Sequence, residues 1–520
     1  MCGIICEICY TGKSLIRNDD RILERNKNRG PDCNSCTEIY LDDGITILFY
    51  GSVLWMQGLE PTVQPVQTET GVLLYNGDIF DETWTNEKSD TQQIMEKLDN
   101  ASILSSEDIV IELKSLKGRK YECIEVPATH IYVLNIKSND MTLVPWNCEI
   151  SDTTSLEEWK SIVQNQQCLP DDEFIFPFDD SIQLDDKDNI VKYIENVTEN
   201  TTGKLDVMKK LMDNNIINDM VSKIIDLLSK SVQIRLKQQP NKCKDCLASN
   251  NTTCNHCTTG ILFSGGLDCS ILAFMANKYL PEEQIIDLIN VAFEKDGNST
   301  FEVPDRKTGK QSLQELRKLC PSRKWVFKEV NITREMLEIM QESIIGDLVY
   351  PRQTILDESL GSALWFAARG EDEKNVSPCR VLLLGSGADE LFGGYTRHRN
   401  AFKRKGWTGL RKELLLDWSR ISFRNLARDN RVICDHGRQP RLPYLDEDFS
   451  KFVLELKPWL KCFPAENLEN GIGDKLMLRL VAYKLGLIDV ATLPKRALQF
   501  GSRIANKKEK GSDISKTFRK

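Results

Sequence analysis

The stretch from Gly260 to Ser270 constrains the fold of this chain more than any other part of the sequence. It opens on the apolar run Ile261-Leu262-Phe263, which predicts a short buried strand. Small residues follow at 264–266, and apolar side chains then recur with helical spacing. A strand joined to a helix by such a loop leaves backbone N–H groups at the helix N-terminus, where an anion binds favourably.

The residues of this loop predict that the anion is a phosphate. Gly265 and Gly266 allow the backbone to approach a phosphate without an intervening Cβ. The hydroxyls of Ser264 and Ser270 can donate to phosphate oxygens, whereas Asp268 would repel them and is expected to hold Mg²⁺ against the phosphate. The alternative is a plain strand-to-helix turn with glycines for tight packing. The whole string, which is not a Walker loop, favours the nucleotide site.

The composition limits the class of protein. A chain of 520 residues with 41% hydrophobic content predicts more than one globular domain. Its net charge of −9 argues against bulk binding to nucleic acid, and no apolar run reaches the length of a membrane helix. The first residues lack the features of a signal peptide, so the 17 cysteines are expected as reduced thiols in the cytoplasm.

Residues 1–165 predict a β-rich first domain. Strands are expected at 45–50, 72–75, 121–126 and 131–136, and helices at 90–99 and 108–116. Removal of Met1 would place Cys2 at the N-terminus, where one residue carries both a thiol nucleophile and an α-amine base.

The order of motifs in this domain resembles the class II glutamine amidotransferases, which have an N-terminal-nucleophile fold. The motifs are Met-Cys-Gly-Ile at 1–4, Arg-Gly-Pro-Asp at 29–32, Gln-Pro at 64–65, Asn-Gly-Asp-Ile-Phe at 76–80 and Ser-Asp at 89–90. The resemblance implies that Cys2 attacks the glutamine side-chain amide and that Asn76 and Gly77 form the oxyanion hole. It also implies that Asp90 holds the glutamine α-amine.

Three departures from that family affect the glutamine site. Leu54 stands where the family has an arginine for the glutamine carboxylate, and Asp78 stands in place of the glutamate after Asn-Gly. The later Arg-Asp-x-x-Gly segment is not visible near 141–147. We therefore expect the fold with weakened glutaminase activity, the alternative being a degenerate domain kept for packing or regulation.

The region between the two glycine-rich parts of the chain contains a linker and a cysteine insert. Residues 166–203 are acidic and rich in turn residues, which predicts a partly extended linker, and residues 206–237 predict one or two helices. Two Cys-x-x-Cys pairs then predict a structural zinc site at Cys243, Cys246, Cys254 and Cys257. The alternatives are a flexible insert with reduced thiols or a redox pair.

From 285 onward, alternating strands and helices predict a doubly wound parallel sheet. Strands are expected at 285–293, 324–330 and 381–384, and helices at 312–320, 334–342 and 356–369. The last strand ends at a second glycine-rich string, 385–395. Ligands bind at the carboxyl ends of such strands, so Gly387 is expected near phosphate, and Asp389 and Glu390 near a metal or a substrate amine. Alternatively, Asp389 caps the following helix.

Both glycine-rich strings resemble known nucleotide sites. The first is similar to the pyrophosphate-binding loop of ATP pyrophosphatases, and the second to the Gly-Glu-Gly-Ala-Asp-Glu-Leu-Phe-Gly-Gly-Tyr segment of asparagine synthetases. The match continues at 441–446, 473–479 and 493–502. The resemblance implies that Lys475 reaches the ATP phosphates. It also implies that Arg441, Lys495 and Arg496 lie near the substrate.

One position of the second string departs from the asparagine synthetases. The glutamate between its first two glycines, a candidate proton acceptor for ammonia attack, is Ser386 here, and serine is a poor base at neutral pH. Together with the altered first domain, this serine makes the sequence most similar to the asparagine synthetase domain-containing branch, a divergent part of the family.

The expected protein has an amidotransferase-like domain at 1–165, a linker at 166–203, an ATP pyrophosphatase-type domain at 204–505 with a cysteine insert at 243–257, and a basic, disordered tail at 506–520. The resemblance implies a ligase of asparagine biosynthesis that uses ATP and Mg²⁺ to adenylate a carboxylate. Aspartate is the first candidate for that carboxylate, and glutamine or ammonia would be the nitrogen source. No nucleic-acid or membrane partner is expected. The sequence leaves both a monomer and a homodimer as alternatives. The rivals are a pseudoenzyme or nucleotide-binding scaffold, and an adenylating enzyme with another nucleophile.

Overall fold

The computed structural model describes residues 2–10, 14, 20–41, 44–69, 71–80, 84, 87–100, 108–110, 130–136, 138, 140–145, 152–155, 158, 188–249, 254–294, 300–464, 468, 471–505 and 510–519. Among these residues, no helix is both long and apolar enough to cross a bilayer.

A five-stranded parallel sheet organises the larger part of the molecule, with the strand order β12-β11-β10-β13-β14. Its strands are β10 (Thr259–Leu262), β11 (Ile286–Phe293), β12 (Trp325–Ile332), β13 (Val381–Leu383) and β14 (Gln439–Arg441). The chain starts at β10, runs outward through β11 and β12, and returns to place β13 and β14 on the other side of β10. The carboxyl ends of β10 and β13 therefore lie side by side at the switch point where such sheets bind ligands.

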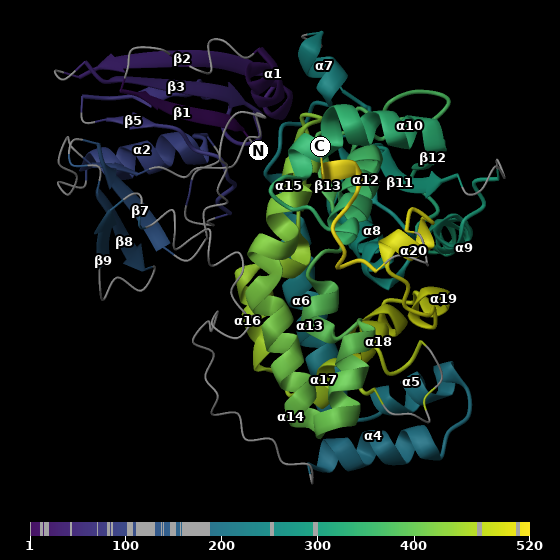
Figure 1. Cartoon of the computed structure of the whole chain (residues 1–520). Coiled ribbons are helices and arrows are strands. Elements are labelled where there is room, and N and C mark those ends of the chain that lie inside the picture. The colour runs from purple at the N-terminus through teal and green to yellow at the C-terminus, as the bar shows by residue number, and fades with distance from the viewer. Residues whose placement is uncertain are drawn as a thin grey trace.

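Alternate residues of the sheet pack into two separate hydrophobic clusters, one on each face. Ile261 and Leu288 belong to a cluster with residues of α6, α8 and α18, whereas Ile289 and Leu382 belong to a cluster with residues of α12 and α15. These helices are α6 (Asn215–Lys237), α8 (Leu267–Tyr279), α18 (Leu476–Lys484), α12 (Ile355–Arg369) and α15 (Ala427–Cys434). Figure 1 shows the helices around the sheet. The predicted doubly wound α/β architecture is confirmed here.

Shorter or more peripheral helices complete this region. They are α4 (Asn189–Glu199), α5 (Lys204–Met212), α7 (Lys244–Ala248), α9 (Pro304–Leu319), α10 (Arg334–Met340), α11 (Gly346–Val349), α13 (Ala388–Phe392), α14 (Thr396–Ile421), α16 (Glu447–Glu455), α17 (Pro458–Lys461), α19 (Ile488–Ala491) and α20 (Leu498–Gly501). The strands predicted at 285–293, 324–330 and 381–384 and the helices predicted at 206–237, 312–320, 334–342 and 356–369 are confirmed within a few residues, except that α9 begins eight residues earlier.

The amino-terminal region is rich in antiparallel strands. Its sheets have the orders β1-β3-β2 and β6-β7-β8-β9, with a separate pair β4-β5. The elements are β1 (Gly3–Cys9), α1 (Asp20–Arg29), β2 (Cys33–Tyr40), β3 (Thr46–Val53), β4 (Val66–Gln67), β5 (Val72–Leu73), α2 (Asp90–Asn100), β6 (Asp108–Val110), β7 (His130–Asn135), β8 (Asp140–Pro145) and β9 (Asp152–Ser155). The predicted strands at 45–50, 72–75 and 131–136 and the helix at 90–99 correspond to β3, β5, β7 and α2, and the strand predicted at 121–126 lies outside the described residues.

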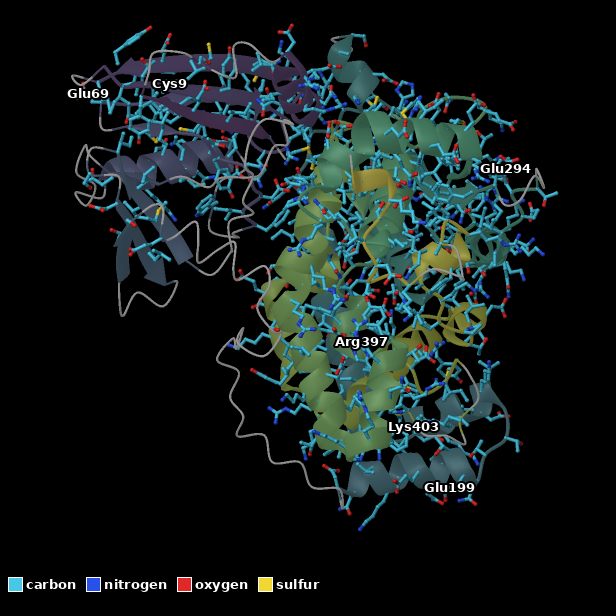
Figure 2. All side chains as sticks on the ribbon, viewed as in Figure 1. Cys9, Glu69, Glu199, Glu294, Arg397 and Lys403 are labelled. Carbon is cyan, nitrogen blue, oxygen red and sulfur yellow. The ribbon has the colours of Figure 1, made fainter. Side chains whose placement is uncertain are left out.

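Two local predictions were wrong. Residues 108–110, expected to begin a helix, form β6 because Ile109 pairs with Leu134 across the antiparallel ladder. Residues 189–199, expected in the linker, form α4, since Val191, Ile194 and Val197 are spaced to bury one helical face. Glu199, labelled in Figure 2, marks the end of α4.

The carboxyl-terminal tail was also wrongly predicted to be disordered. Its residues 510–519 dock on the start of α12, where Ile514 forms a β-bridge with Thr354 and the Ser515 N–H donates to the Gln353 carbonyl at 2.8 Å. Phe518 is 7% exposed and packs in the α12 cluster. Backbone hydrogen bonds and one buried aromatic ring together hold this polar segment against α12.

The two regions meet through buried ion pairs. Arg380, just before β13, donates from both terminal nitrogens to the Asp32 carboxylate, at 3.2 and 2.7 Å, and also donates to the Trp55 carbonyl. Arg441 of β14 pairs with Asp78 at 3.3 Å. Both arginines are at most 2% exposed, so these contacts lie inside the interface and not at its rim.

Candidate functional site

A cleft of about 820 Å³ opens at the carboxyl ends of β10 and β13. Its volume lies in the range of small-molecule sites. The residues predicted to bind nucleotide or substrate that line it are Ser264, Gly266, Asp268, Gly387, Asp389, Glu390, Lys475, Lys495 and Arg496, together with Ser386. They come from four separate segments of the sequence, which the sheet topology brings together.

The first glycine loop combines a binding edge with a packing contact. Gly266 is the N-cap of α8, and its N–H points to the Ser264 hydroxyl at 3.3 Å. Gly265 has φ +76°, and a Cβ there would lie 2.4 Å from the backbone of Gly309 in α9. The structure therefore explains Gly265 by left-handed backbone and close helix packing, whereas Gly266 lines the cleft as expected.

A buried lysine connects the two glycine-rich strings. Lys475 is 1% exposed, and its Nζ lies 2.7 Å from Asp268 and 2.8 Å from Asp389. Its backbone has φ +52°, the left-handed region that non-glycine residues seldom adopt. Such backbone strain is concentrated at ligand sites, where the surrounding structure holds it in place. Lys495 approaches Asp389 from the other side.

The charges in this cluster support one another. Burial disfavours the ionised form of Asp389, but the Lys475 and Lys495 cations outweigh it and hold the pKa of that carboxyl well below its usual range. Burial likewise opposes the Lys475 ammonium, and the two facing aspartates raise its pKa. Asp389 and Lys475 are therefore both charged at neutral pH and place fixed charges in the cleft.

Glu390 occupies a different electrostatic environment from its neighbour. Burial and the adjacent Asp389 carboxylate raise the pKa of Glu390. Its carboxylate accepts hydrogen bonds from the Tyr395 hydroxyl at 2.7 Å and from the Asn425 amide at 3.1 Å. Two adjacent acids on one short helix thus face different partners, which suits distinct roles.

Sequence reasoning missed part of the cleft. Arg397, labelled in Figure 2, lines the cleft and pairs with Asp417, to which His398 also bonds at 2.7 Å. These residues sit on α14, whose length and polar surface are typical of an exposed helix. Only the adjacency of 397 and 398 to the second glycine string could have drawn attention to them.

Asp305 is a further missed residue. This carboxyl is 5% exposed in the cleft, packs against Gly501, and has one oxygen without a hydrogen-bond partner among the described residues. Burial raises the pKa of Asp305 to about 7, and Arg496 and Lys495 oppose that rise. A buried acid poised near neutral pH is a common feature of functional sites.

We expect Asp305 to make stability depend on pH. Because folding raises its pKa from 3.8 to about 7, its contribution is complete below about pH 4 and is lost as the pH rises to 7. At pH 8, Asp305→Asn should therefore have a higher free energy of unfolding than the unmodified protein. The difference should be up to about 4 kcal/mol, since one pKa unit corresponds to about 1.4 kcal/mol. Urea unfolding from pH 4 to 8 measures this. The exposed neighbour Glu302→Gln is the control, and an unchanged pH slope in Asp305→Asn would contradict the expectation.

Besides Gly265, two predicted ligands lie outside the cleft. The Ser270 hydroxyl is fully buried in α8 and has no hydrogen-bond partner among the described residues. Arg441 lies in the domain interface, where it donates to the Arg235 carbonyl and pairs with Asp78. Neither residue lines the cleft. Both were predicted as ligands because they lie next to a motif in the sequence. That adjacency does not show whether a side chain faces the cleft or the packed side of its strand or helix.

The residues around Cys2 enclose a much smaller space. Cys2, Leu54, Gly77, Asp78 and Asp90 all line one cavity of about 30 Å³, room for water but not for an amino acid. Burial raises the pKa of the Cys2 thiol, and burial with the Asp78 carboxylate raises the pKa of Asp90 to about 6. Both shifts oppose the thiolate and the carboxylate that glutamine cleavage would use.

Asn76 is buried beside this cavity. Its side chain is 6% exposed, and neither its amide nitrogen nor its oxygen has a hydrogen-bond partner among the described residues. A buried amide without partners is costly, which indicates a position suited to a ligand. Gly77 follows it, and a Cβ at Gly77 would meet the Tyr75 hydroxyl at 2.4 Å.

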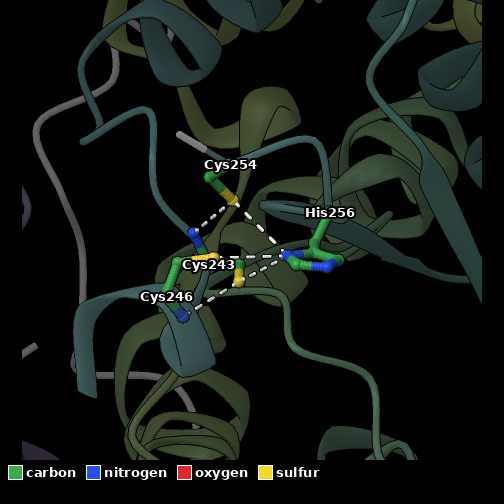
Figure 3. Close-up of side chains that lie close together, drawn as sticks. All are labelled: Cys243, Cys246, Cys254 and His256. Carbon is green, nitrogen blue, oxygen red and sulfur yellow. Dashed lines mark hydrogen bonds between the residues drawn. The ribbon is translucent and has the colours of Figure 1, made fainter. Parts of the chain in front are cut away.

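The cysteine insert gathers a different set of side chains from the predicted one. Cys243, Cys246 and Cys254 converge with His256, and not with Cys257 (Figure 3). The Cys257 thiol is buried and donates to the Thr259 carbonyl at 3.0 Å. The sequence prediction missed His256 because two matching Cys-x-x-Cys pairs already supply four thiols.

Comparison with known proteins agrees with this architecture. The asparagine synthase family model matches residues 254–408, which contain β10 to β13 and both glycine strings. The chain is 37% identical to "Asparagine synthetase domain-containing protein CG17486" of Drosophila melanogaster, over 99% of this chain and 100% of that protein. It is 31% identical to "Asparagine synthetase domain-containing protein 1" of Homo sapiens, over 99% and 97% of the two chains.

A third relative carries an enzyme name. The chain is 23% identical to the "Probable asparagine synthetase [glutamine-hydrolyzing]" of Acanthamoeba polyphaga mimivirus, over 91% of this chain and 81% of that protein. The parallel sheet, its helices and the matched residues together identify an α/β domain like those of the ATP pyrophosphatases. The protein belongs to the family of asparagine synthetase domain-containing proteins.

Proposed function

We propose that this protein is an amide-forming ligase that adenylates a carboxylate with ATP, the aspartate side chain being the first candidate, and takes its nitrogen from ammonia. The observation that carries this proposal is Lys475, whose Nζ contacts Asp268 and Asp389 between the two glycine-rich strings of the cleft. Burying a cation and two carboxylates costs desolvation free energy, which suggests a functional reason for the arrangement. Such a cation would stabilise the negative charge of a departing pyrophosphate.

The residues of the cleft suit the first step, attack of a carboxylate oxygen on the α-phosphorus. That bond forms as the bond from the α-phosphorus to the α–β bridging oxygen breaks, and pyrophosphate leaves with the bonding pair. The N-terminus of α8 and Ser264 line the cleft, and in this proposal they bind the leaving phosphates. Lys475 and Lys495 would neutralise the charge that develops on pyrophosphate.

The donor set of the cleft also fits Mg²⁺. Asp268 and Asp389 both contact the Lys475 ammonium and line the same cleft, and hard oxygen ligands of this type are those that Mg²⁺ prefers. Bound there, Mg²⁺ would supply charge neutralisation to the triphosphate. The protein's own part is to hold the Asp389 carboxylate ionised, which Lys475 and Lys495 do.

In the second step, ammonia attacks the activated carbonyl carbon, the bond from that carbon to the AMP oxygen breaks, and the surplus proton passes to solvent. Ser386 lines the cleft at the position where the asparagine synthetases have glutamate. Because serine is a poor base at neutral pH, this step lacks a positioned proton acceptor at that point and is expected to be slow.

The amino-terminal region is proposed to retain an amidotransferase-like fold up to about residue 165, with a linker between it and the ligase domain. Its cavity of about 30 Å³ and the apolar Leu54 oppose glutamine binding. Its ion pairs with the ligase domain through Asp32 and Asp78 support a role in holding that domain.

We expect product formation with ammonium and little or none with glutamine. Loss of a charged contact to a substrate carboxylate costs about 1.5–3 kcal/mol of binding free energy. Glutamine should therefore be at least about 10-fold less effective than ammonium as the nitrogen source. The measurement is amide product and AMP with each nitrogen source. Cys2→Ser is the control and should leave the ammonium rate unchanged. Rapid glutamine-dependent product that Cys2→Ser abolishes would contradict this expectation.

The adenylation itself is tested by pyrophosphate release from ATP and Mg²⁺ with aspartate and other carboxylates, beside Asp268→Ala. Release that depends on one carboxylate and disappears in Asp268→Ala would support the proposal and name the substrate. Absence of release from folded protein with every carboxylate would overturn it.

A further inference from the structure

A second site lies between α6 and β10, away from the cleft. The ligand atoms of Cys243, Cys246, Cys254 and His256 all lie within 4.8 Å of one another (Figure 3). Cys243 and Cys246 are buried, Cys254 is half-buried and His256 is exposed. The asparagine synthase reaction uses none of these residues, so the cluster calls for its own explanation.

The distances match the edges of a metal tetrahedron. The His256 Nδ1 lies 3.6 Å from the Cys243 sulfur, 3.3 Å from the Cys246 sulfur and 3.9 Å from the Cys254 sulfur. Zinc bonds of about 2.3 Å to sulfur and about 2.0–2.1 Å to nitrogen would place S and N about 3.5 Å apart in a tetrahedral site. One nitrogen facing three sulfurs at this spacing is the arrangement of a four-ligand centre.

The backbone around the cluster stabilises anionic sulfur. The Cys246 N–H donates to the Cys243 sulfur at 3.4 Å, and the Cys243 N–H donates to the Cys254 sulfur at 3.2 Å. Such N–H donors outside the ligand set orient thiolates and compensate their charge. A disulfide would use two of the sulfurs and leave the third sulfur and the histidine without a role, so the geometry favours a metal over a redox pair.

The geometry points to a closed, structural Zn²⁺ site with the ligands Cys243, Cys246, Cys254 and His256. Three thiolates and one imidazole are a donor set typical of structural zinc, and four protein ligands leave no open position for chemistry. This inference does not depend on the proposed ligase function.

The contacts of the insert explain what the metal would stabilise. The Lys244 N–H donates to the Pro378 carbonyl at 2.9 Å, and its ammonium donates to the His436 carbonyl at 2.7 Å. Pro378 and His436 precede β13 and β14, and the insert itself runs into β10. The ion would thus fasten three neighbouring strands at their amino ends, opposite the cleft.

The test is metal content and cobalt spectroscopy of the full-length protein, purified under reducing conditions without chelators. We expect one zinc per chain. After exchange for Co²⁺, tetrahedral d–d bands and the charge-transfer intensity of three thiolates should appear. His256→Cys should keep the metal and add the intensity of a fourth thiolate, which a misfolded variant could not do.

Two further variants separate this site from the symmetric four-cysteine alternative. Cys257→Ser should leave the cobalt spectrum unchanged, and the exposed Cys36→Ser is a control for losing any one thiol. Loss of a thiolate band in Cys257→Ser, with none in His256→Asn, would overturn the assigned ligand set. Protein free of zinc that gives no tetrahedral cobalt spectrum would overturn the site altogether.

Discussion

Replacing Lys475 with methionine is expected to reduce ATP cleavage by about 10²–10³-fold, the usual effect of removing one preorganised charge from a transition-state site. The same change leaves Asp268 facing Asp389 without the cation that both contact. Breaking a buried ion pair by removing one partner costs about 3–5 kcal/mol, so the free energy of unfolding should fall as well. Pyrophosphate release and urea unfolding measure the two effects.

A second buried lysine provides the matched control. Lys461 is 4% exposed and lies outside the cleft, where its ammonium donates only to a backbone carbonyl at 3.1 Å in the contacts that the structure describes. Burial lowers the pKa of Lys461 to about 7 from 10.5, because it disfavours the charged ammonium. The free energy of unfolding should therefore be highest at high pH, where this amine is neutral, and should fall as the pH falls.

Lys461→Met should therefore keep full ATP cleavage and unfold no more easily than the unmodified protein at pH 7. If Lys475→Met and Lys461→Met behave alike, the cleft lysine has no special role and the account of the cluster is wrong.

Arg380→Met is expected to cost about 3–5 kcal/mol of unfolding free energy, because it leaves the Asp32 carboxylate without its bidentate partner inside the interface. The amino-terminal region should also become more sensitive to proteases than the ligase domain. Adding Asp32→Asn should recover part of the loss, since the two side chains act as one unit. Urea unfolding and limited proteolysis of the single and double variants test this.

An exposed ion pair is the control for the interface. Arg334 and Glu338, one turn apart on α10, have side chains that are 79% and 60% exposed. Arg334→Ala should cost at most about 0.5 kcal/mol. A loss below about 1 kcal/mol in Arg380→Met would show that the interface does not depend on this pair.

The sheet and most of the cleft could be predicted from the sequence because their signals are local. A strand, a small-residue loop and a helix stand in one short stretch at 260–280, and the β-α alternation after it determines which strand ends meet. Residues next to a glycine loop, such as Asp268 and Asp389, were thereby placed correctly in the cleft.

Other features depend on contacts that no local pattern reports. The poised carboxyl of Asp305 results from burial against α20, and the Arg441 side chain turns toward Asp78 in another part of the chain. His256 replaces Cys257 because the chain turns into β10 at that point, which buries the last cysteine in the core. Each is a consequence of tertiary packing, which sequence spacing does not contain.

The most direct test of the account follows one oxygen atom. If a carboxylate oxygen attacks the α-phosphorus, aspartate labelled with ¹⁸O in its side-chain carboxylate must transfer one labelled oxygen to AMP when the amide forms. Mass spectrometry of the AMP from reactions with ATP, Mg²⁺ and ammonium measures the transfer. The account predicts one ¹⁸O per AMP formed. AMP without label, or ADP as the nucleotide product, would contradict it.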